Sequence, residues 1–449
     1  MIEALSHTIT LEGKIPCGGF LRLDGAKNSA LRLMAASILT SGAISLNRFP
    51  STQGDVTVQW AMLENIGKTI AAETDRIVIR ENSELNTTSH WNDRSIRNTL
   101  LMLGALTARF GVGRVPLPGG CNLGERKYDL HEMVLRAMGA EVWVEKGAYL
   151  CAEAKGRLKG AEIHLPIRST GATENGILCG VLAEGRTVIW HPHIRPEIMD
   201  LIAMLRKMGA SIAVFGQERI EIQGVEGLTG AEHEVIPDNM EALTWAVAAV
   251  VTGGDIEISP FPYEHLEVPM VFLRESGMKY YRGEDSLIVR GGTPYPLEIS
   301  TGPYPGINSD MQPIMAVFAA CARGESRIID LRFPGRYQYA EELRKMGLCY
   351  QVDGNMLVID GGKPFTGAEV NAVDLRAGAA LVLAGLVAEG ETVIHNAWQI
   401  DRGYCDLPGK LQSLGATVRV NVSDANPTET RPADKGALQN DSGLHDAIP

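Results

Sequence analysis

The stretch LRAMGAEVWV at residues 135–144 recurs in similar form as LQSLGATVRV at residues 411–420. In both, a leucine and a glycine close an apolar, helix-periodic segment, and a run of alternating apolar and polar residues follows. This pattern predicts an amphipathic helix, a left-handed glycine after its last turn, and then a half-buried strand. The leucine–glycine pair occurs six times, at Leu63 and Gly67, Leu135 and Gly139, Leu205 and Gly209, Leu273 and Gly277, Leu343 and Gly347, and Leu411 and Gly415.

The six glycines lie at nearly equal intervals of 72, 70, 68, 70 and 68 residues. A second series runs half a period out of phase, where alanine-rich helices end in Gly42, Gly111, Gly185, Gly253, Gly324 and Gly390. A period near 70 is longer than the roughly 20 to 50 residues of a one-dimensional repeat protein. Each unit is therefore predicted to be a small α/β module, with two helices and about four strands, that shares its core with other copies.

Composition limits the classes of function. The chain has 449 residues, enough for two or three domains, and its 45% hydrophobic and 6% aromatic content predicts aliphatic cores. The 54 acidic and 42 basic residues give a net charge of −12, which repels nucleic acid, so any phosphate site must be a local basic pocket. The longest apolar stretches, such as residues 377–388, are shorter than the roughly 20 residues of a membrane span. No nucleic-acid or membrane partner is expected.

The remaining features of the chain favour an ordinary cytoplasmic protein. Residues 1–13 lack the basic and then apolar run of a secretory signal. The seven cysteines include no C-x-x-C pair and no zinc-ligand spacing, so reduced thiols and no metal are expected. Residues 423–449 break the repeat and lack an apolar face, which predicts a disordered tail.

Two segments in the first half place polar groups at predicted helix starts, where anions bind. Lys27 and Asn28 follow a small-residue turn and precede an apolar helix. Arg168, Ser169, Thr170 and Gly171 open another helix with hydroxyl and backbone N–H groups that could hold a phosphate. A solvated lysine beside a helix cap and a plain capping box would explain the same two patterns.

Cys121 lies in a Pro/Gly loop, with Arg126, Lys127 and His131 close by in sequence. Most cysteines are inert packing residues, but neighbouring cations and partial exposure favour the reactive thiolate. In the second half, Asp310 places a carboxylate after the loop TGPYPGINS at residues 301–309. Arginines recur there at Arg336, Arg376 and Arg402, and their meaning depends on whether the fold brings them together.

Taken together, these segments closely resemble the enolpyruvyltransferase family, from about residue 8 to residue 422. The motifs that carry the resemblance are GAKN at 25–28, LPGGC at 117–121, GATEN at 171–175, PEI at 196–198, PYPG at 303–306 with DMQ at 310–312, DLRA at 374–377 and DRGY at 401–404. The resemblance implies two inverse α/β barrel-like domains of three repeated units each. Residues 26–236 would form the first domain and residues 1–25 with 237–422 the second, so that the first strand belongs to the second domain.

The family's chemistry implies a role for each candidate residue. A hydroxyl of the acceptor adds to C2 of phosphoenolpyruvate while C3 is protonated, and the tetrahedral intermediate then loses phosphate. Cys121 would be the general acid at C3, Asp310 would accept the acceptor's proton, and Lys27 would complete the catalytic set. Phosphoenolpyruvate would be held by Lys27, Arg126 and Arg402, with Arg97, Arg336 and Arg376 as further positive charges. Further substrate contacts would come from Asn28, Asp129, Arg168, Ser169, Thr170 and Gly171. The resemblance implies no metal and no organic cofactor.

The acceptor stays open, because departures from the family pattern cluster where the acceptor would bind. Asn98-Thr99 replaces Ala-Ser, Lys127-Tyr128 replaces Pro-Val, Asn239-Met240 replaces Arg-Ile, Arg32 replaces a proline, Thr170 replaces a valine, and Leu101 stands where a bulkier residue often contacts the sugar. One acceptor is the 3-hydroxyl of UDP-N-acetylglucosamine, in peptidoglycan precursor synthesis. Another is the ribose 3′-hydroxyl of uridine monophosphate (UMP), in nucleoside antibiotic synthesis, with Arg168 and Lys127 on a monophosphate. A catalytically silent homologue fits less well because Cys121 and Asp310 are present, and the LPGGC loop argues against a shikimate 3-phosphate acceptor. The sequence does not predict an oligomeric state.

Overall fold

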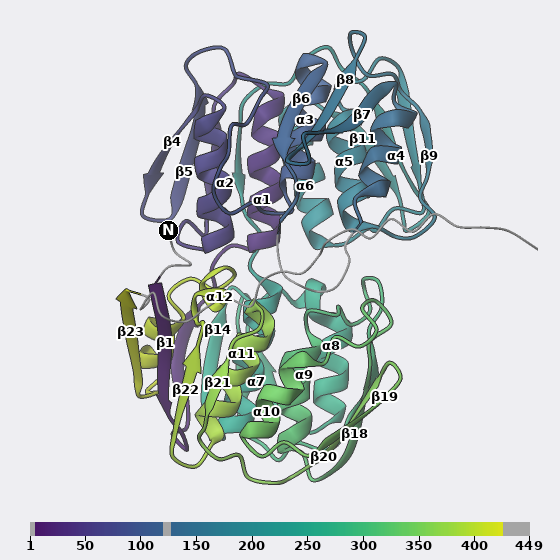
Figure 1. Ribbon diagram of the computed structural model, residues 1–449. Helices are drawn as coiled ribbons and strands as arrows, with labels where there is room; N and C mark the ends of the chain where they lie inside the picture. Colours follow the sequence, from purple (N-terminus) through teal and green to yellow (C-terminus); the bar gives the residue numbers. More distant parts are fainter. Residues whose placement is uncertain (1–4, 120–126, 425–449) are drawn as a thin grey trace, which may run out of the picture.

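The structure, a computed structural model, describes residues 5–119 and 127–424. The chain forms two α/β bodies, one above the other in Figure 1, with sheets on the outside and helices inside each. Ser423 and Asp424, predicted as the first two residues of a disordered tail, instead end the last strand and pair with the first strand, so the predicted start of the tail was wrong by two residues. Cys121, Arg126 and residues 425–449 lie outside the described residues. No helix in the described ranges is long and apolar enough to cross a bilayer.

Six sheets repeat the predicted unit around the two bodies. In the described part of the chain, five sheets have four strands and one has three, and the fourth position of that sheet is taken by a parallel bridge between Thr88 and Arg114. The first body contains β13(Ala231–Glu234)-β3(Ile44–Asn47)-β5(Arg76–Glu81)-β4(Lys68–Glu73), β6(Val112–Pro116)-β8(Tyr149–Ala154)-β7(Ala140–Glu145) and β11(Ser211–Phe215)-β12(Arg219–Gln223)-β10(Arg186–Trp190)-β9(Glu162–His164). The second contains β15(Lys279–Arg282)-β16(Leu287–Arg290)-β14(Asp255–Ser259)-β2(Gly18–Arg22), β17(Glu298–Ser300)-β18(Gly324–Ile329)-β20(Met356–Gly361)-β19(Tyr350–Asp353) and β21(Glu369–Asn371)-β22(Glu391–His395)-β1(Leu5–Glu12)-β23(Val418–Asp424). The predicted α/β repeat is confirmed.

Two kinds of helix alternate along the chain. Six helices are buried on nearly all sides, as expected for helices that are apolar all round: α1(Lys27–Ala36), α3(Thr99–Phe110), α5(Thr170–Gly180), α7(Asn239–Thr252), α9(Gln312–Cys321) and α11(Leu375–Val387). Six others bury only one face: α2(Gly54–Asn65), α4(Asp129–Ala137), α6(Pro196–Lys207), α8(Tyr263–Glu275), α10(Gln338–Lys345) and α13(Leu407–Ser413). Short turns η2(Ser37–Leu39) and α12(Trp398–Asp401) complete the set.

The repeated glycines that follow the one-sided helices adopt the left-handed conformation predicted for them. Their φ angles lie between 91° and 107°, as at Gly139, where φ is 92°. Gly42, in the second series, is required for a different reason. A Cβ atom built on Gly42 would lie 2.2 Å from the backbone nitrogen of Gly230, so the two segments can approach only if this position is glycine.

The chain passes between the two bodies at two adjacent points. β1 and β2 pair within sheets of the second body, and the chain enters the first body after Gly25. The crossings run side by side, because Ala26 N donates to Ile236 O at 2.7 Å and Asp238 N donates to Asp24 O at 3.0 Å. One hydrophobic core spans residues 30–235, and the other spans 9–23 with 240–418. The boundaries 26–236 and 1–25 with 237–422 stay a prediction, and they fall at these crossings.

Candidate active site

A cleft of about 1200 Å³ lies between the two bodies and is lined by residues of both. The N-termini of all six buried helices reach it, through Lys27, Asn98, Thr170, Asn239, Met311 and Leu375. A helix N-terminus carries a partial positive charge and backbone N–H groups that have no partner within the helix. The threefold repeat in each body therefore directs six such ends at one space, which favours binding of an anion.

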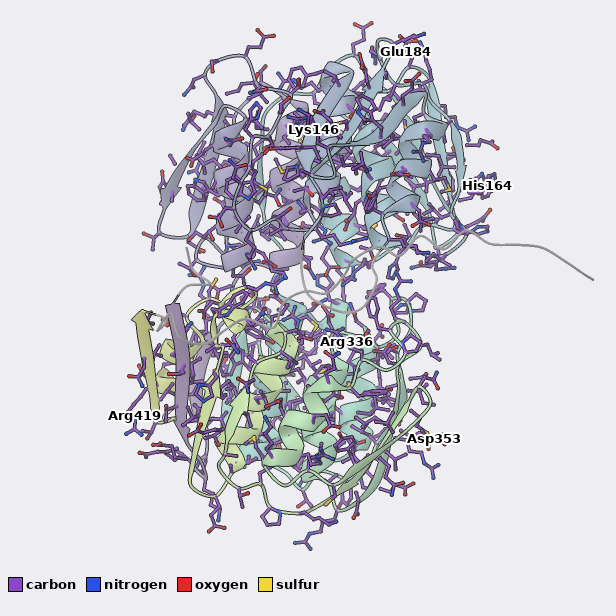
Figure 2. All side chains as sticks on the ribbon, in the orientation of Figure 1. Lys146, His164, Glu184, Arg336, Asp353 and Arg419 are labelled. Atoms are coloured by element: carbon purple, nitrogen blue, oxygen red, sulfur yellow. The ribbon has the colours of Figure 1, made fainter. Side chains whose placement is uncertain are left out.

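The fold brings the predicted site residues together. Of those that the structure describes, the ones that line the cleft are Lys27, Asn28, Arg97, Asp129, Arg168, Ser169, Thr170, Gly171, Asp310, Arg336 and Arg402. Figure 2 shows Arg336 in the part of the second body that is nearer the first, whereas His164, Glu184, Asp353 and Arg419 lie at the margins of the molecule in this view. Arg376 does not line the cleft and lies just behind its wall, with Nε 3.8 Å from Asp310 Oδ2. Cys121 and Arg126 are outside the described residues.

Asp55, near the start of α2, joins cations of both bodies. Its carboxylate lies 3.3 Å from Lys27 Nζ, 2.9 Å from Arg94 Nη2 and 3.1 Å from Arg402 Nε. Burial alone would raise the pKa of Asp55, but the positive charges of Lys27, Arg402 and Arg94 together hold it well below its ordinary value. Asp55 is therefore ionised and positions Lys27 and Arg402 against each other across the cleft.

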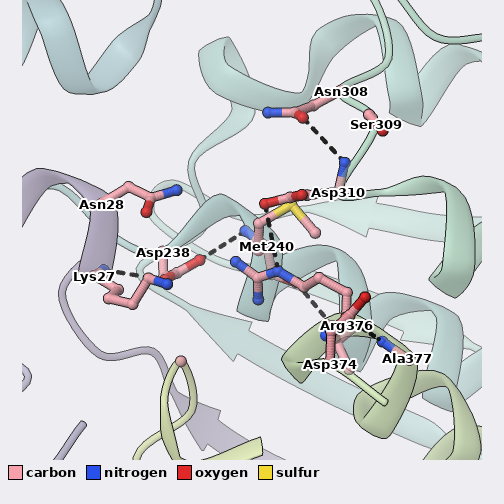
Figure 3. Close-up of polar contacts among 12 residues, drawn as sticks. Lys27, Asn28, Asp238, Met240, Asn308, Ser309, Asp310, Asp374, Arg376 and Ala377 are labelled. Carbon is pink, nitrogen blue, oxygen red and sulfur yellow. Dashed lines mark hydrogen bonds and ion pairs between the residues drawn. The ribbon is translucent and has the colours of Figure 1, made fainter. Parts of the chain in front are cut away.

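The first turn of α1 is fixed by the N-cap of α7. Asp238 Oδ1 accepts a hydrogen bond from Met240 N at 2.8 Å, and Asp238 Oδ2 accepts one from Lys27 N at 3.2 Å (Figure 3). One carboxylate thus caps a helix of the second body and holds the backbone of Lys27 in the first. This contact fixes where the Lys27 side chain enters the cleft.

Asp310 is the half-buried carboxylate on the opposite wall. Arg336 Nη1 lies 2.8 Å from Asp310 Oδ1. Asp310 N donates to Asn308 Oδ1 at 3.0 Å (Figure 3). Burial would raise the pKa of Asp310, but Arg336 and Arg376 outweigh it and hold the pKa well below its ordinary value. The group is therefore a carboxylate at neutral pH, as a proton acceptor must be.

Arg376 offers hydrogen-bond donors that the described residues do not use. Its side chain is 1% exposed, and its Nε and Nη1 atoms have no hydrogen-bond partner within the described ranges. Burial lowers the pKa of Arg376, but Tyr404 and Asp310 raise it above its ordinary value, so the guanidinium stays charged. Asp374 Oδ1 accepts from Arg376 N at 2.7 Å and fixes the start of α11. A buried cation with unsatisfied donors can donate hydrogen bonds to a bound anion.

A hydrogen-bonded chain links the two bodies at the other end of the cleft. Tyr304 N donates to His193 Nε2 at 3.1 Å, and His193 Nδ1 lies 2.8 Å from Thr170 Oγ1. Because Nε2 accepts from a backbone N–H, the proton of the neutral ring is on Nδ1 and is donated to Thr170. Burial, with the charge of Arg195, lowers the pKa of His193 to about 4, which keeps the ring neutral.

Gly171 permits the burial of His131 beneath the start of α5. A Cβ atom at Gly171 would lie 2.7 Å from His131 Nε2, so any larger residue would displace the ring. The His131 ring is 6% exposed, and burial together with Arg97 lowers its pKa to about 3. The ring is therefore neutral at physiological pH and acts here as a packing group.

His131 should make the protein less stable in mild acid. The unfolded chain binds a proton at His131 below about pH 6.5, and the folded chain does not until about pH 3, so stability falls as pH decreases through this window. Between pH 6.5 and 5, wild type should lose about 2 kcal/mol more free energy of unfolding than His131→Asn. Denaturant unfolding at both pH values measures this, with His164→Asn as the control on a side chain that is 63% exposed. Equal losses in wild type and His131→Asn would contradict the assignment.

Sequence reasoning missed several residues that organise the cleft. Asp55 resembles an ordinary acidic residue in the first turn of a helix, and His193 lies in a loop with His191 that has no recognised motif. Asp330 is fully buried and accepts from Thr301 Oγ1 at 2.9 Å and from Gln312 Nε2 at 3.2 Å, which anchors the loop that carries Asp310. Its only sequence signal is a carboxylate directly after the apolar strand β18. Among the described residues, no group of three or more His, Cys, Asp or Glu side chains could hold a metal ion.

Comparison with known proteins identifies relatives of the whole chain. Residues 11–411 match the EPSP synthase (3-phosphoshikimate 1-carboxyvinyltransferase) family. The chain is 44% identical over 407 residues to a UDP-N-acetylglucosamine 1-carboxyvinyltransferase of Carboxydothermus hydrogenoformans, a match that covers 90% of this chain and 96% of the relative. It is 39% identical over 409 residues to one of Caldanaerobacter subterraneus, covering 91% and 98%.

Two solved structures are similar to this chain in fold. The enolpyruvyl transferase NikO from Streptomyces tendae superposes with a TM-score of 0.85 at 25% identity, covering 93% of this chain and 99% of NikO. EPSP synthase from Acinetobacter baumannii gives a TM-score of 0.68 at 20% identity, covering 93% and 100%. Both superpositions extend over the two bodies, so the arrangement in Figure 1 is that of an enolpyruvyl transferase.

Proposed function

Since the chain belongs to the EPSP synthase family of enolpyruvyltransferases, we propose that it transfers the enolpyruvyl group of phosphoenolpyruvate to a hydroxyl of a uridine nucleotide. The acceptor we favour is the 3-hydroxyl of UDP-N-acetylglucosamine, because the relatives named for that activity are 38–44% identical over nine-tenths of the chain. The observation that supports the proposal is the cleft, in which Asp310 lies 2.8 Å from Arg336 of the second body and near enough to Lys27 of the first body for the lysine charge to lower its pKa. We place this activity in the cytoplasm, in peptidoglycan precursor synthesis.

In this reaction the cleft cations hold phosphoenolpyruvate. Its carboxylate and phosphate carry up to three negative charges, and Lys27, Arg402, Arg336 and Arg376 supply positive charge and charge-assisted hydrogen bonds. Arg97 would add a further positive charge. Arg126, which is not among the described residues, would act with them. Phosphoenolpyruvate thereby neutralises positive charges that Asp55, Asp310 and Asp374 balance in part.

Phosphoenolpyruvate also determines when Asp310 can act as a base. Beside Arg336 and Arg376 alone, Asp310 is a weak proton acceptor because its pKa is held low. An anion bound to these arginines cancels part of their charge and raises the pKa of Asp310 toward the range in which it can take the acceptor's hydroxyl proton. C2 of phosphoenolpyruvate forms the new C–O bond as C3 gains a proton, for which we assign Cys121. Loss of phosphate and of a C3 proton then restores the double bond.

UMP is the second candidate acceptor. The structural match to the enolpyruvyl transferase NikO, at a TM-score of 0.85 over nearly the full length of both chains, supports this alternative, although the relatives at 38–44% identity give more support to UDP-N-acetylglucosamine. The exposed guanidinium of Arg168, which donates to Gln217 Oε1 at 2.7 Å, lies at the cleft margin where a monophosphate could reach it.

Phosphate release from phosphoenolpyruvate tests the proposal and distinguishes the acceptors. The purified protein is incubated with phosphoenolpyruvate and, in separate reactions, UDP-N-acetylglucosamine, UMP, uridine or no acceptor. We expect release with UDP-N-acetylglucosamine and none without an acceptor. Release with UMP alone would replace our preferred acceptor, and release with no acceptor in the panel would overturn the proposed function.

Cys121 should be the thiol that reacts with a small anionic epoxide that mimics phosphoenolpyruvate, such as fosfomycin, because neighbouring cations lower a thiol pKa and concentrate the reagent. Burial raises the thiol pKa of Cys179, Cys321 and Cys405 to about 12, so these three should stay unreactive. Peptide mass spectrometry after brief labelling measures the adducts, and Cys121→Ser is the control. An adduct mainly on another cysteine would contradict the role of Cys121.

A further inference from the structure

Two Arg–Glu pairs line the cleft apart from the cations assigned to phosphoenolpyruvate. Arg32 Nε, on α1, donates to Glu174 Oε1 on α5 at 2.6 Å. Arg195 precedes α6, and its Nε and Nη2 atoms donate to the two carboxylate oxygens of Glu197 at 2.7 and 2.8 Å. Arg32, Glu174 and Arg195 line the cleft, and Glu197 does not.

Each pair has a buried carboxylate and a guanidinium that reaches the cleft. The side chains of Glu174 and Glu197 are 1% and 3% exposed, whereas those of Arg32 and Arg195 are 16% and 14% exposed. A buried carboxylate that binds one edge of a guanidinium fixes the direction of the other edge. The glutamates therefore hold both arginines in set orientations.

The free edges of both arginines are still available. Arg32 Nη2 and Arg195 Nη1 have no hydrogen-bond partner in residues 5–119 and 127–424, and Arg32 Nη1 makes only a long contact of 3.5 Å with Asn28 Oδ1. Buried Arg–Glu pairs give little net stability compared with apolar packing, so stability alone does not account for two of them at a cleft wall. A ligand that accepts hydrogen bonds from both would account for them.

Residues of both pairs line the same cleft as Asp310. Burial lowers the pKa of Arg195, but the charges of Glu197, Glu174 and Asp310 raise it above its ordinary value. Arg195 therefore lies within electrostatic range both of the carboxylate that holds Arg32 and of the proposed base. Asp310 itself contacts Arg336 and Arg376, so the anion of phosphoenolpyruvate has its own cations.

We propose that Arg32 and Arg195, oriented by Glu174 and Glu197, form a second anion subsite that binds a phosphate of the acceptor nucleotide. This inference rests on the proposed function, because it assigns a ligand to the acceptor side of the same cleft. The subsite makes the enzyme select acceptors that carry a phosphate over those that lack one. Arg32 is at the helix position where the family usually has proline, so the use of an arginine at this position for the contact is a property of this chain.

Nucleotide binding without phosphoenolpyruvate tests the subsite separately from turnover. Isothermal titration calorimetry compares UDP-N-acetylglucosamine, UMP and uridine on wild type, Arg195→Gln and the double variant Arg32→Gln with Glu174→Gln, which leaves no unpaired buried carboxylate. Arg109→Gln is the matched control, because Arg109 is 19% exposed and paired with Glu81 at 2.7 Å outside the cleft.

Wild type should bind a phosphorylated probe at least tenfold more tightly than uridine. The two cleft variants should lose about tenfold or more of that affinity, the scale of one charge-assisted hydrogen bond, with binding of uridine unchanged. Arg109→Gln should behave as wild type. A cleft variant that keeps the full preference, or a wild type with no preference, would overturn the subsite. Failure of the proposed function would be seen instead as absence of phosphate release from phosphoenolpyruvate.

Discussion

Asp310→Asn should lower turnover by about 100-fold or more while leaving the fold and acceptor binding intact. The amide keeps the shape of the side chain but cannot take a proton, and loss of a positioned acid or base has effects of this scale. Asp310 is 29% exposed and anchored through its own backbone to Asn308, so the substitution should not disturb the surrounding loop. Steady-state phosphate release measures turnover, and calorimetric titration measures acceptor binding.

The control for Asp310→Asn should remove the charge of another carboxylate that is paired with an arginine and lies outside the cleft. Glu145 is 35% exposed, lies 3.0 Å from Arg114 and is outside the cleft, so Glu145→Gln changes charge and an arginine pair to a similar degree. We expect Glu145→Gln to retain turnover within about twofold. An Asp310→Asn variant with near-normal turnover would exclude Asp310 as the base.

Arg376→Lys should lower kcat/KM for phosphoenolpyruvate by about 100-fold or more. Lysine keeps the positive charge but lacks the planar guanidinium group. The variant would therefore lose the Nε and Nη1 donors, which lie beside Asp310 and have no hydrogen-bond partner among the described residues. Two charge-assisted hydrogen bonds at about 1.5 to 3 kcal/mol each account for a loss of this size. Kinetics at varied phosphoenolpyruvate, with the acceptor saturating, measures the effect.

Arg109→Lys provides the comparison, because Arg109 is paired with Glu81 in the first body and does not reach the cleft. Its kcat/KM for phosphoenolpyruvate should match wild type. Thermal unfolding of both variants shows whether either loses structure. A well-folded Arg376→Lys variant whose KM and kcat are both within about threefold of wild type would remove Arg376 from the anion site.

The repeat could be predicted from the sequence because local sequence patterns mark the end of each helix. A glycine such as Gly139, after an amphipathic helix, must adopt positive φ to end that helix, and the φ of 92° confirms the reading. Regular spacing then predicted six units, and residues 5–119 and 127–424 form six sheets, of which five have four strands and one has three. The partition of the units between two bodies required the family resemblance, since β1 and β2 pair with strands more than 200 residues away.

The site was only partly predictable, because its organisation depends on contacts across the two bodies. Lys27 and Asp310 stood out by their loops, but Asp55 gave no signal until Arg402, 347 residues away, was seen to contact it at 3.1 Å. The same holds for His193 and Tyr304, which meet across the cleft at 3.1 Å. Local periodicity predicts helices and strands, whereas charge networks of this kind depend on tertiary proximity, which one sequence does not record.

In the proposed reaction, a carbon–oxygen bond forms to C2 of phosphoenolpyruvate while C3 gains a solvent-derived proton. Mass spectrometry of the product formed from phosphoenolpyruvate and UDP-N-acetylglucosamine in D₂O tests this most directly. We expect an acceptor that has gained a carboxyvinyl group, with deuterium in its vinyl position and one phosphate released for each product. Phosphate release with an unmodified acceptor, or a product without vinyl deuterium, would contradict it.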